Sequence, residues 1–159
     1  MDMHFTHCDH SEQYLTLHDC IATRAYFENG TLGFELENGL WISPDHPESH
    51  LTEMVRTDFA KVEYTLTDGE DYDVMVYVFT RAFDQRTVGT EWTLTELLDK
   101  INSGECNLEF LYQYLDFHAR MVECELNFAN GQGHKKCIIK IHASKVSYYW
   151  NNLCEDKPW

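Results

Sequence analysis

The chain has 159 residues, of which 43% are hydrophobic and 14% aromatic, and this length and composition are typical of a single globular domain, residues 1–159, with its own packed core. The formal net charge is −15, which repels phosphate backbones and anionic lipids and so argues against nucleic acid and membrane surfaces as partners. Residues 1–75 hold 16 acidic and 3 basic side chains, so we expect this acidic half to attract a basic protein partner.

The six cysteines are too few for a disulfide scaffold at this length, and no two have Cys-x-x-Cys spacing. The first residues show no basic region followed by an apolar run, and no stretch of about 18 apolar residues occurs. We therefore expect a cytoplasmic protein with free thiols.

Residues 1–15 are expected to form a flexible N-terminal segment, because chain termini are often poorly ordered. This segment contains His4, His7 and His10 at three-residue spacing, and on a helix these imidazoles would lie along one face. Imidazole suits zinc and nickel. A His-rich tract without a second ligand pair is only a compositional indication, so we predict no metal and no cofactor.

Residues 16–43 predict a three-stranded meander with tight turns at Asn29-Gly30 and Asn38-Gly39. Asn-Gly is the strongest short hairpin signal, because a type I′ turn needs positive φ at both central residues. In the middle strand Leu32, Phe34 and Leu36 are expected to face the core. Glu35 and Glu37 then face solvent. In the preceding run, residues 20–28, the inward set is expected to be Ile21, Ala25 and Phe27.

Pro44 and Pro47 predict an irregular loop that gathers His46, Glu48 and His50. Such residues are ligands for metals and groups for general acid–base chemistry, and His46 and Glu48 have the His-x-Glu spacing of zinc deaminases. The accompanying Pro-Cys-x-x-Cys is absent, so we reject a deaminase. A small-ligand-binding protein or enzyme that uses this loop, residues 45–50, stays open as an alternative function.

A second hairpin is predicted from residues 62–66 and 73–81, joined by an acidic turn that holds Asp68, Glu70 and Asp71. The turn lacks the ligand order of a calcium loop and is interpreted as a solvated tip. Together with Glu35 and Glu37, these acids are the predicted interaction residues.

Residues 93–103 predict an amphipathic helix, preceded by an irregular connection over residues 81–91. Thr93 and Glu96 form a capping-box pattern, and Gly104 supplies a C-terminal stop. Four apolar residues at helical spacing form one stripe: Leu94, Leu97, Leu98 and Ile101.

The last third of the chain predicts a return to β structure. One strand is marked by Leu108, Phe110, Tyr112 and Tyr114, and the next alternates at Val122, Cys124, Leu126 and Phe128. Residues 130–134 form a turn, and residues 138–142 and 146–150 complete the sheet.

The run Leu17-His18-Asp19-Cys20, followed by a strand, an Asn-Gly turn and Leu32-Gly33-Phe34-Glu35, resembles small β-rich bacterial proteins of unknown function. Some of those proteins are thought to be immunity proteins that neutralise a toxin. The resemblance covers about 30 residues and implies a bacterial origin and a non-catalytic role, and it identifies no functional residue.

The sequence as a whole predicts an α+β, mainly β fold: antiparallel sheet of about eight to nine strands built from hairpins, with one packed helix at 93–103. An all-β sandwich or barrel is the alternative. The expected function is a non-catalytic binding or interaction protein whose acidic N-terminal half meets a basic partner, and the resemblance implies the immunity type as one form of it. An assembly subunit is a further alternative, and the sequence leaves the oligomeric state open.

Overall fold

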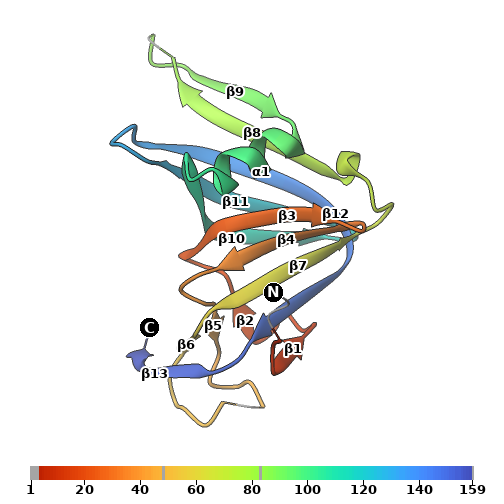
Figure 1. Cartoon of the computed structure of the whole chain (residues 1–159), viewed down its shortest axis with the longest axis vertical. Coiled ribbons are helices and arrows are strands. Elements are labelled where there is room, and N and C mark those ends of the chain that lie inside the picture. The colour runs from red at the N-terminus through yellow and green to blue at the C-terminus, as the bar shows by residue number, and fades with distance from the viewer. Residues whose placement is uncertain (1–3, 48, 83, 159) are drawn as a thin grey trace.

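The structure, a computed structural model, describes residues 4–47, 49–82 and 84–158, and it is mainly β (Figure 1). Along the described residues, thirteen strands, one 3₁₀ turn and one α-helix follow one another. In order they are β1 (His7–Asp9), β2 (Leu15–Thr16), β3 (Cys20–Glu28), β4 (Thr31–Leu36), β5 (Trp41–Ile42), β6 (Val55–Thr57), β7 (Ala60–Leu66), η1 (Asp71–Asp73), β8 (Val74–Arg81), β9 (Thr87–Trp92), α1 (Leu94–Asn102), β10 (Cys106–Asp116), β11 (Ala119–Phe128), β12 (His134–Trp150) and β13 (Leu153–Pro158).

The main sheet has nine antiparallel strands in the order β11-β10-β3-β4-β7-β12-β8-β9, with β1 attached to β12. Because β11 also pairs with β12, six of these strands close into a barrel. A second sheet of four short strands, in the order β13-β6-β5-β2, lies at the end of the molecule where both termini are found (Figure 1). The fold therefore agrees with the predicted mainly β class and also contains the barrel considered as the alternative.

The barrel interior is filled by alternate residues of each strand, as a period of two requires. Leu32, Phe34 and Leu36 of β4 are fully buried, as predicted. At Asn29-Gly30 both residues have positive φ, 51° and 73°, which confirms the predicted tight turn. In β3 Ala25 is buried and Phe27 packs against the core, as predicted, but Cys20 and Ala22 are buried in place of Ile21. The reason is a β-bulge between Ala22 and Arg24, which changes the facing of the strand.

The predicted helix is confirmed as α1, which Thr93 and Glu96 cap reciprocally at the N-terminus. Its Leu97 and Ile101 are buried in the core. At its other end Asn102 bonds to the backbone of Ala25 on β3, accepting from the amide at 2.9 Å and donating to the carbonyl at 2.7 Å. The side-chain amide therefore takes the place of a neighbouring strand and fixes α1 against the barrel.

Three predicted connections are wrong. The third strand of the meander, β5, pairs with β2 and β6 in the small sheet. At the second Asn-Gly pair only Gly39 has positive φ, so the type I′ turn predicted there does not form. The predicted hairpin of β7 and β8 does not form: within the described chain no ladder joins them, and they pair with successive segments of β12. Residues 87–92 form β9 on the edge of β8, where exposure on both faces removes the alternation that would predict a strand.

Residues 4–15, which we expected to be flexible, are held against the barrel. β1 pairs with the end of β12, His7 opposite Trp150 and Asp9 opposite Tyr148. Phe5 stacks on Phe59 with ring centroids 6.0 Å apart. Residues 4–15 are thus part of the folded structure.

Replacing Leu97 by alanine should lower the free energy of unfolding by about 2–5 kcal/mol, because the change leaves a cavity between α1 and the barrel. Leu98 is the matched control, since it is the neighbouring residue of the same type but only half-buried. Chemical denaturation of the two variants measures the difference. Equal losses for L97A and L98A would contradict the packing described for α1.

Candidate functional site

The hairpin of β10 and β11 exposes an unusual amount of apolar surface. A bulge at Leu111 shifts the register, so Tyr112 and Tyr114 of the predicted strand point away from the barrel, whereas Leu108 and Phe110 are buried. They are 55% and 52% exposed. Phe117 occupies the turn with a positive φ of 48° and is 98% exposed.

Five of the seven large apolar side chains that are exposed in the described chain come from this one hairpin. Scattered exposed apolar residues are normal in proteins, but their concentration in one place marks an interaction surface. We call residues 112–121 the aromatic hairpin. Its exposed members are Tyr112, Tyr114, Leu115, Phe117 and Met121.

A pocket of about 420 Å³ opens beside the aromatic hairpin, between β10 and the chain that leads into β3. We call it the mouth pocket, because it lies where inward-facing residues of β10 reach the end of the barrel. Its volume is in the range of small-molecule sites. Its lining consists of Glu12, Leu15, Thr16, Leu17, His18, Phe110, Leu111, Tyr112, Gln113, Leu115 and Tyr148.

A polar network lies behind the mouth pocket. Arg120 of β11 faces inward, and its Nη1 pairs with Oε1 of Glu12 from the N-terminal segment. The same carboxylate oxygen accepts a hydrogen bond from the hydroxyl of Tyr148 at 3.3 Å. Gln113 Nε2 donates to the hydroxyl of the fully buried Tyr64 at 3.2 Å. The network thus compensates the inward-facing charge of Arg120.

The phenols of this network remain protonated at neutral pH. Burial raises the pKa of Tyr64 and of Tyr148, and the nearby Glu12 raises the pKa of Tyr148 further. Burial also raises the pKa of the Cys20 thiol to about 12, so Cys20 is not an activated nucleophile. These groups are therefore suited to hydrogen bonding and packing.

At the rim His18 donates from Nδ1 to the carbonyl oxygen of Leu111 at 2.6 Å. Its Nε2 lies 3.5 Å from a carboxylate oxygen of Asp19, and its ring is 5.2 Å from that of Tyr112. These contacts fix the imidazole across the bulge and join the wall of the mouth pocket to the aromatic hairpin.

Of the three candidate residues in the loop predicted at 45–50, the structure describes two, His46 and His50, and it does not place these two in one cleft. His46 is buried, and its Nε2 lies 2.7 Å from Oδ2 of Asp9, with the ring edge-on to Tyr14 and Trp150. His50 is exposed, and Glu48 lies outside the described residues. His46 therefore ties the loop to the N-terminal segment, and a chemical role of the loop stays a prediction.

The N-terminal histidines lie on extended chain, so the helical arrangement considered for them does not occur. His7 stacks on Trp150 with centroids 5.3 Å apart, His10 lies 3.0 Å from the hydroxyl of Ser147, and His4 is exposed. Among residues 4–47, 49–82 and 84–158, no group of three His, Cys, Asp or Glu side chains is placed to hold a metal ion.

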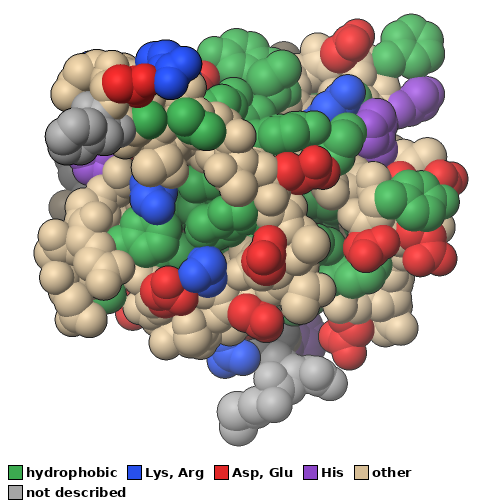
Figure 2. Space-filling model, turned by 90° about the horizontal axis from the view of Figure 1, so that it is seen from above, with side chains coloured by type: hydrophobic (Ala, Val, Ile, Leu, Met, Phe, Trp, Pro, Cys, Tyr) green, Lys and Arg blue, Asp and Glu red, His purple; other side chains and the backbone are tan. Residues whose placement is uncertain are grey.

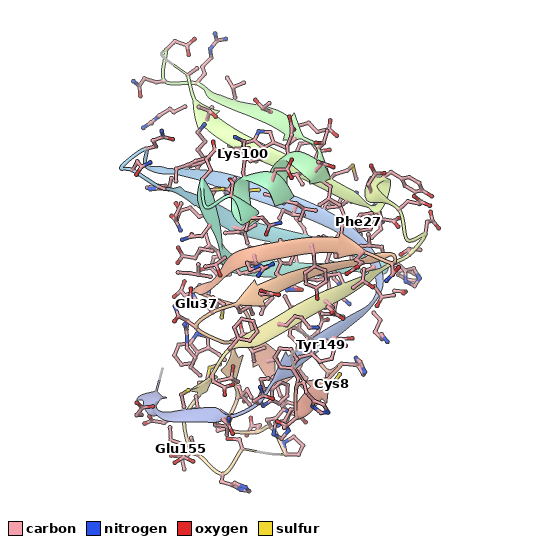
Figure 3. The ribbon with its side chains drawn as sticks, viewed as in Figure 1. Cys8, Phe27, Glu37, Lys100, Tyr149 and Glu155 are labelled. Carbon is pink, nitrogen blue, oxygen red and sulfur yellow. The ribbon has the colours of Figure 1, made fainter. Side chains whose placement is uncertain are left out.

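The five predicted interaction acids fall into two separate groups. Glu35 is half-buried on the outer face of β4, 3.6 Å from Arg24, and Glu37 is exposed where that strand ends (Figure 3). Asp68, Glu70 and Asp71 are exposed in the loop around η1. That loop touches the Asn29-Gly30 turn at the opposite end of β4, where a Cβ on Gly30 would lie 3.1 Å from Gly69. Their role in binding stays a prediction.

Acidic side chains are interspersed with lysine and arginine over the face seen in Figure 2 and gather at the edge where Figure 1 has η1. No uniformly acidic face is seen in this view. On this face the negative charge is therefore mixed with positive charge and is densest at one edge.

The aromatic hairpin and the mouth pocket were missed from the sequence. One signal was present: Tyr112, Tyr114, Leu115 and Phe117 follow one another in a strand and turn whose exposed positions should be polar. The pocket had no comparable signal, because its lining comes from three separate parts of the chain.

Comparisons of the chain with protein-family models, curated proteins and solved structures found no match. Within the described part of the chain, no helix has the length and hydropathy needed to cross a bilayer.

Replacing Asp9 by asparagine tests the contact between His46 and the N-terminal segment. Burial opposes ionisation of Asp9, but hydrogen bonds from the amide of Ser11 and from His46 outweigh it, so its pKa is lowered. The folded state then binds fewer protons than the unfolded state, and the stabilisation is present above about pH 4 and lost as the pH falls below it. We expect D9N to cost about 1.5–3 kcal/mol at neutral pH and progressively less in acid.

Denaturation of D9N and wild type across this pH range measures the effect, with the exposed Asp45 of the same loop changed to asparagine as the control. A deficit of D9N that stays constant down to low pH would contradict the ionised contact.

Proposed function

We propose that this protein is a non-catalytic binding protein that docks through the aromatic hairpin onto a basic protein partner. The observation that carries the proposal is the concentration of five exposed apolar side chains on one hairpin, with Phe117 98% exposed at its tip. Tyrosine and phenylalanine are the residue types that anchor protein interfaces.

The conformation of the tip supports a binding role. Phe117 adopts φ of 48°, in a region that costs a residue with a Cβ of the order of 1–2 kcal/mol. Its ring packs edge-on against the neighbouring His118 with centroids 5.2 Å apart. The exposed ring of Phe117 buries no surface that would stabilise the isolated protein and offset this cost. Its position is therefore explained best by a contact with a partner.

The charge of the molecule supports a basic partner. The net charge of −15 raises the local concentration of cationic proteins and speeds their encounter. The exposed acids at η1, Asp68, Glu70 and Asp71, belong to this steering field. An immunity protein that neutralises a basic toxin is one function with this chemistry.

The decisive variant is F117S, because it removes the most exposed anchor without touching the core. Loss of a central aromatic anchor typically costs about 2 kcal/mol or more of binding free energy. The matched control is Y72S, which removes an aromatic residue that is 63% exposed but lies outside the hairpin. Wild type and both variants are used to capture proteins from a bacterial lysate, and a captured protein is then purified for direct titration.

The proposal expects a basic partner whose affinity falls with F117S and is unchanged with Y72S. Neutralising the acids at η1 should slow association mainly at low salt, since exposed charges are screened at high ionic strength. A partner that binds F117S as well as wild type would overturn the assignment of the hairpin. Concentration-dependent self-association that F117S abolishes would show instead that the hairpin is an interface between copies.

A further inference from the structure

We infer that the mouth pocket binds a small organic amine with an apolar body. This inference is independent of docking by the aromatic hairpin, because it rests on groups inside the pocket and concerns the isolated protein. It assigns a ligand class to a cavity that the predicted site residues do not include.

The walls of the pocket favour an apolar body. Leu15, Leu17 and Phe110 form its buried floor, with exposed fractions of 8%, 5% and 2%, and Leu115 stands at its rim with 61% exposed. The volume of about 420 Å³ accepts a molecule larger than water, and burial of its apolar surface would contribute about 25 cal/mol per Å².

The carboxylate and the amide of the pocket lining, Glu12 and Gln113, leave hydrogen-bond acceptors available. Glu12 uses Oε1 for both Arg120 and Tyr148, and its Oε2 has no hydrogen-bond partner among the described residues. Gln113 donates from Nε2 to Tyr64, so the side-chain oxygen is the end of the amide left for a ligand. A ligand that donates hydrogen bonds therefore fits better than one that accepts them.

The electrostatics favour a cation among such donors. No lysine or arginine lines the pocket in the described chain, and the guanidinium of Arg120 lies behind Glu12. The rings of Phe110, Tyr112 and Tyr148 line the pocket, and the face of an aromatic ring attracts a cation. The net charge of −15 acts in the same direction.

A purely structural role for Glu12 explains only part of this arrangement. An inward-facing arginine on a barrel strand requires a carboxylate partner, and Oε1 supplies it. Pairing with Arg120 does not explain why a cavity lies beside the Glu12 carboxylate, nor why Oε2 of Glu12 has no hydrogen-bond partner among the described residues. Binding of an amine uses both.

Three ligands that share one apolar body test the inference on the wild-type protein: phenethylamine, phenethyl alcohol and phenylacetate. They are titrated into ¹⁵N-labelled protein and followed by NMR. We expect the amine to bind saturably, with the largest shifts in residues 12–18 and 110–115, and at least about tenfold more tightly than the carboxylate. The alcohol should bind with intermediate affinity.

Variants then identify the carboxylate. E12Q should weaken binding of phenethylamine about tenfold while leaving the alcohol nearly unaffected, and E12D should restore part of the amine affinity. E53Q is the matched control, because Glu53 is an exposed glutamate outside the pocket. The melting temperature of each variant shows whether it is folded.

Absence of saturable amine binding to the wild-type protein would overturn the inference, as would binding of the carboxylate with equal affinity or shifts outside the two segments. These three outcomes need no variant, so they decide the question even if E12Q fails to fold.

Discussion

The fold depends on the requirement that β12, a strand of 17 residues, be hydrogen-bonded along both edges. Residues 136–141 pair on one edge with β11 and on the other with β8. Further along, Tyr148 and Tyr149 pair with β7 and with β1. A buried strand leaves no backbone group unpaired, so four partners share β12. This sharing closes the barrel, separates β7 from β8 and holds the N-terminal segment in place.

Local irregularities in this framework create both candidate binding features. The bulge at Leu111 turns Tyr112 and Tyr114 outward while Gln113 stays opposite the buried Val122. Beyond it, Leu115 pairs with Arg120 at the rim. One extra residue in β10 thus gives the hairpin an apolar outer face and gives the pocket its polar wall. Bulges commonly redirect side chains in this way near binding sites.

Prediction from the sequence succeeded where a pattern is local. The alternation of Leu32, Phe34 and Leu36 and the capping box at Thr93 each depend on neighbours within one element, and the burial and geometry of both confirm them. It failed where pairing is long-range. The residue pattern of β7 and β8 does not indicate that each pairs with β12. Two strands joined by a short turn are more simply interpreted as a hairpin.

The candidate site was harder to predict than the fold for the same reason. Its groups come from the N-terminal segment, β10 and β12, which only the closed barrel brings together. The bulges at residues 22–24 and 110–112 also reverse the facing that strict alternation assigns. The net charge predicts a partner class but no location, because the five predicted interaction acids fall into two separate groups, one on β4 and at its end and one around η1.

Glu12 connects the stability of the fold to the candidate pocket. Without it, the inward-facing guanidinium of Arg120 would be a partly buried charge without an ionic partner, and its Nε is already buried without a hydrogen bond. The N-terminal segment therefore has to dock for the end of the barrel to be electrostatically satisfied. Docking of the same segment also places Leu15 and Leu17 opposite Phe110 and so forms the pocket. The same stretch of chain therefore supplies the carboxylate that pairs with Arg120 and the apolar wall of the mouth pocket. The pocket thus forms only when this stretch is docked against the barrel.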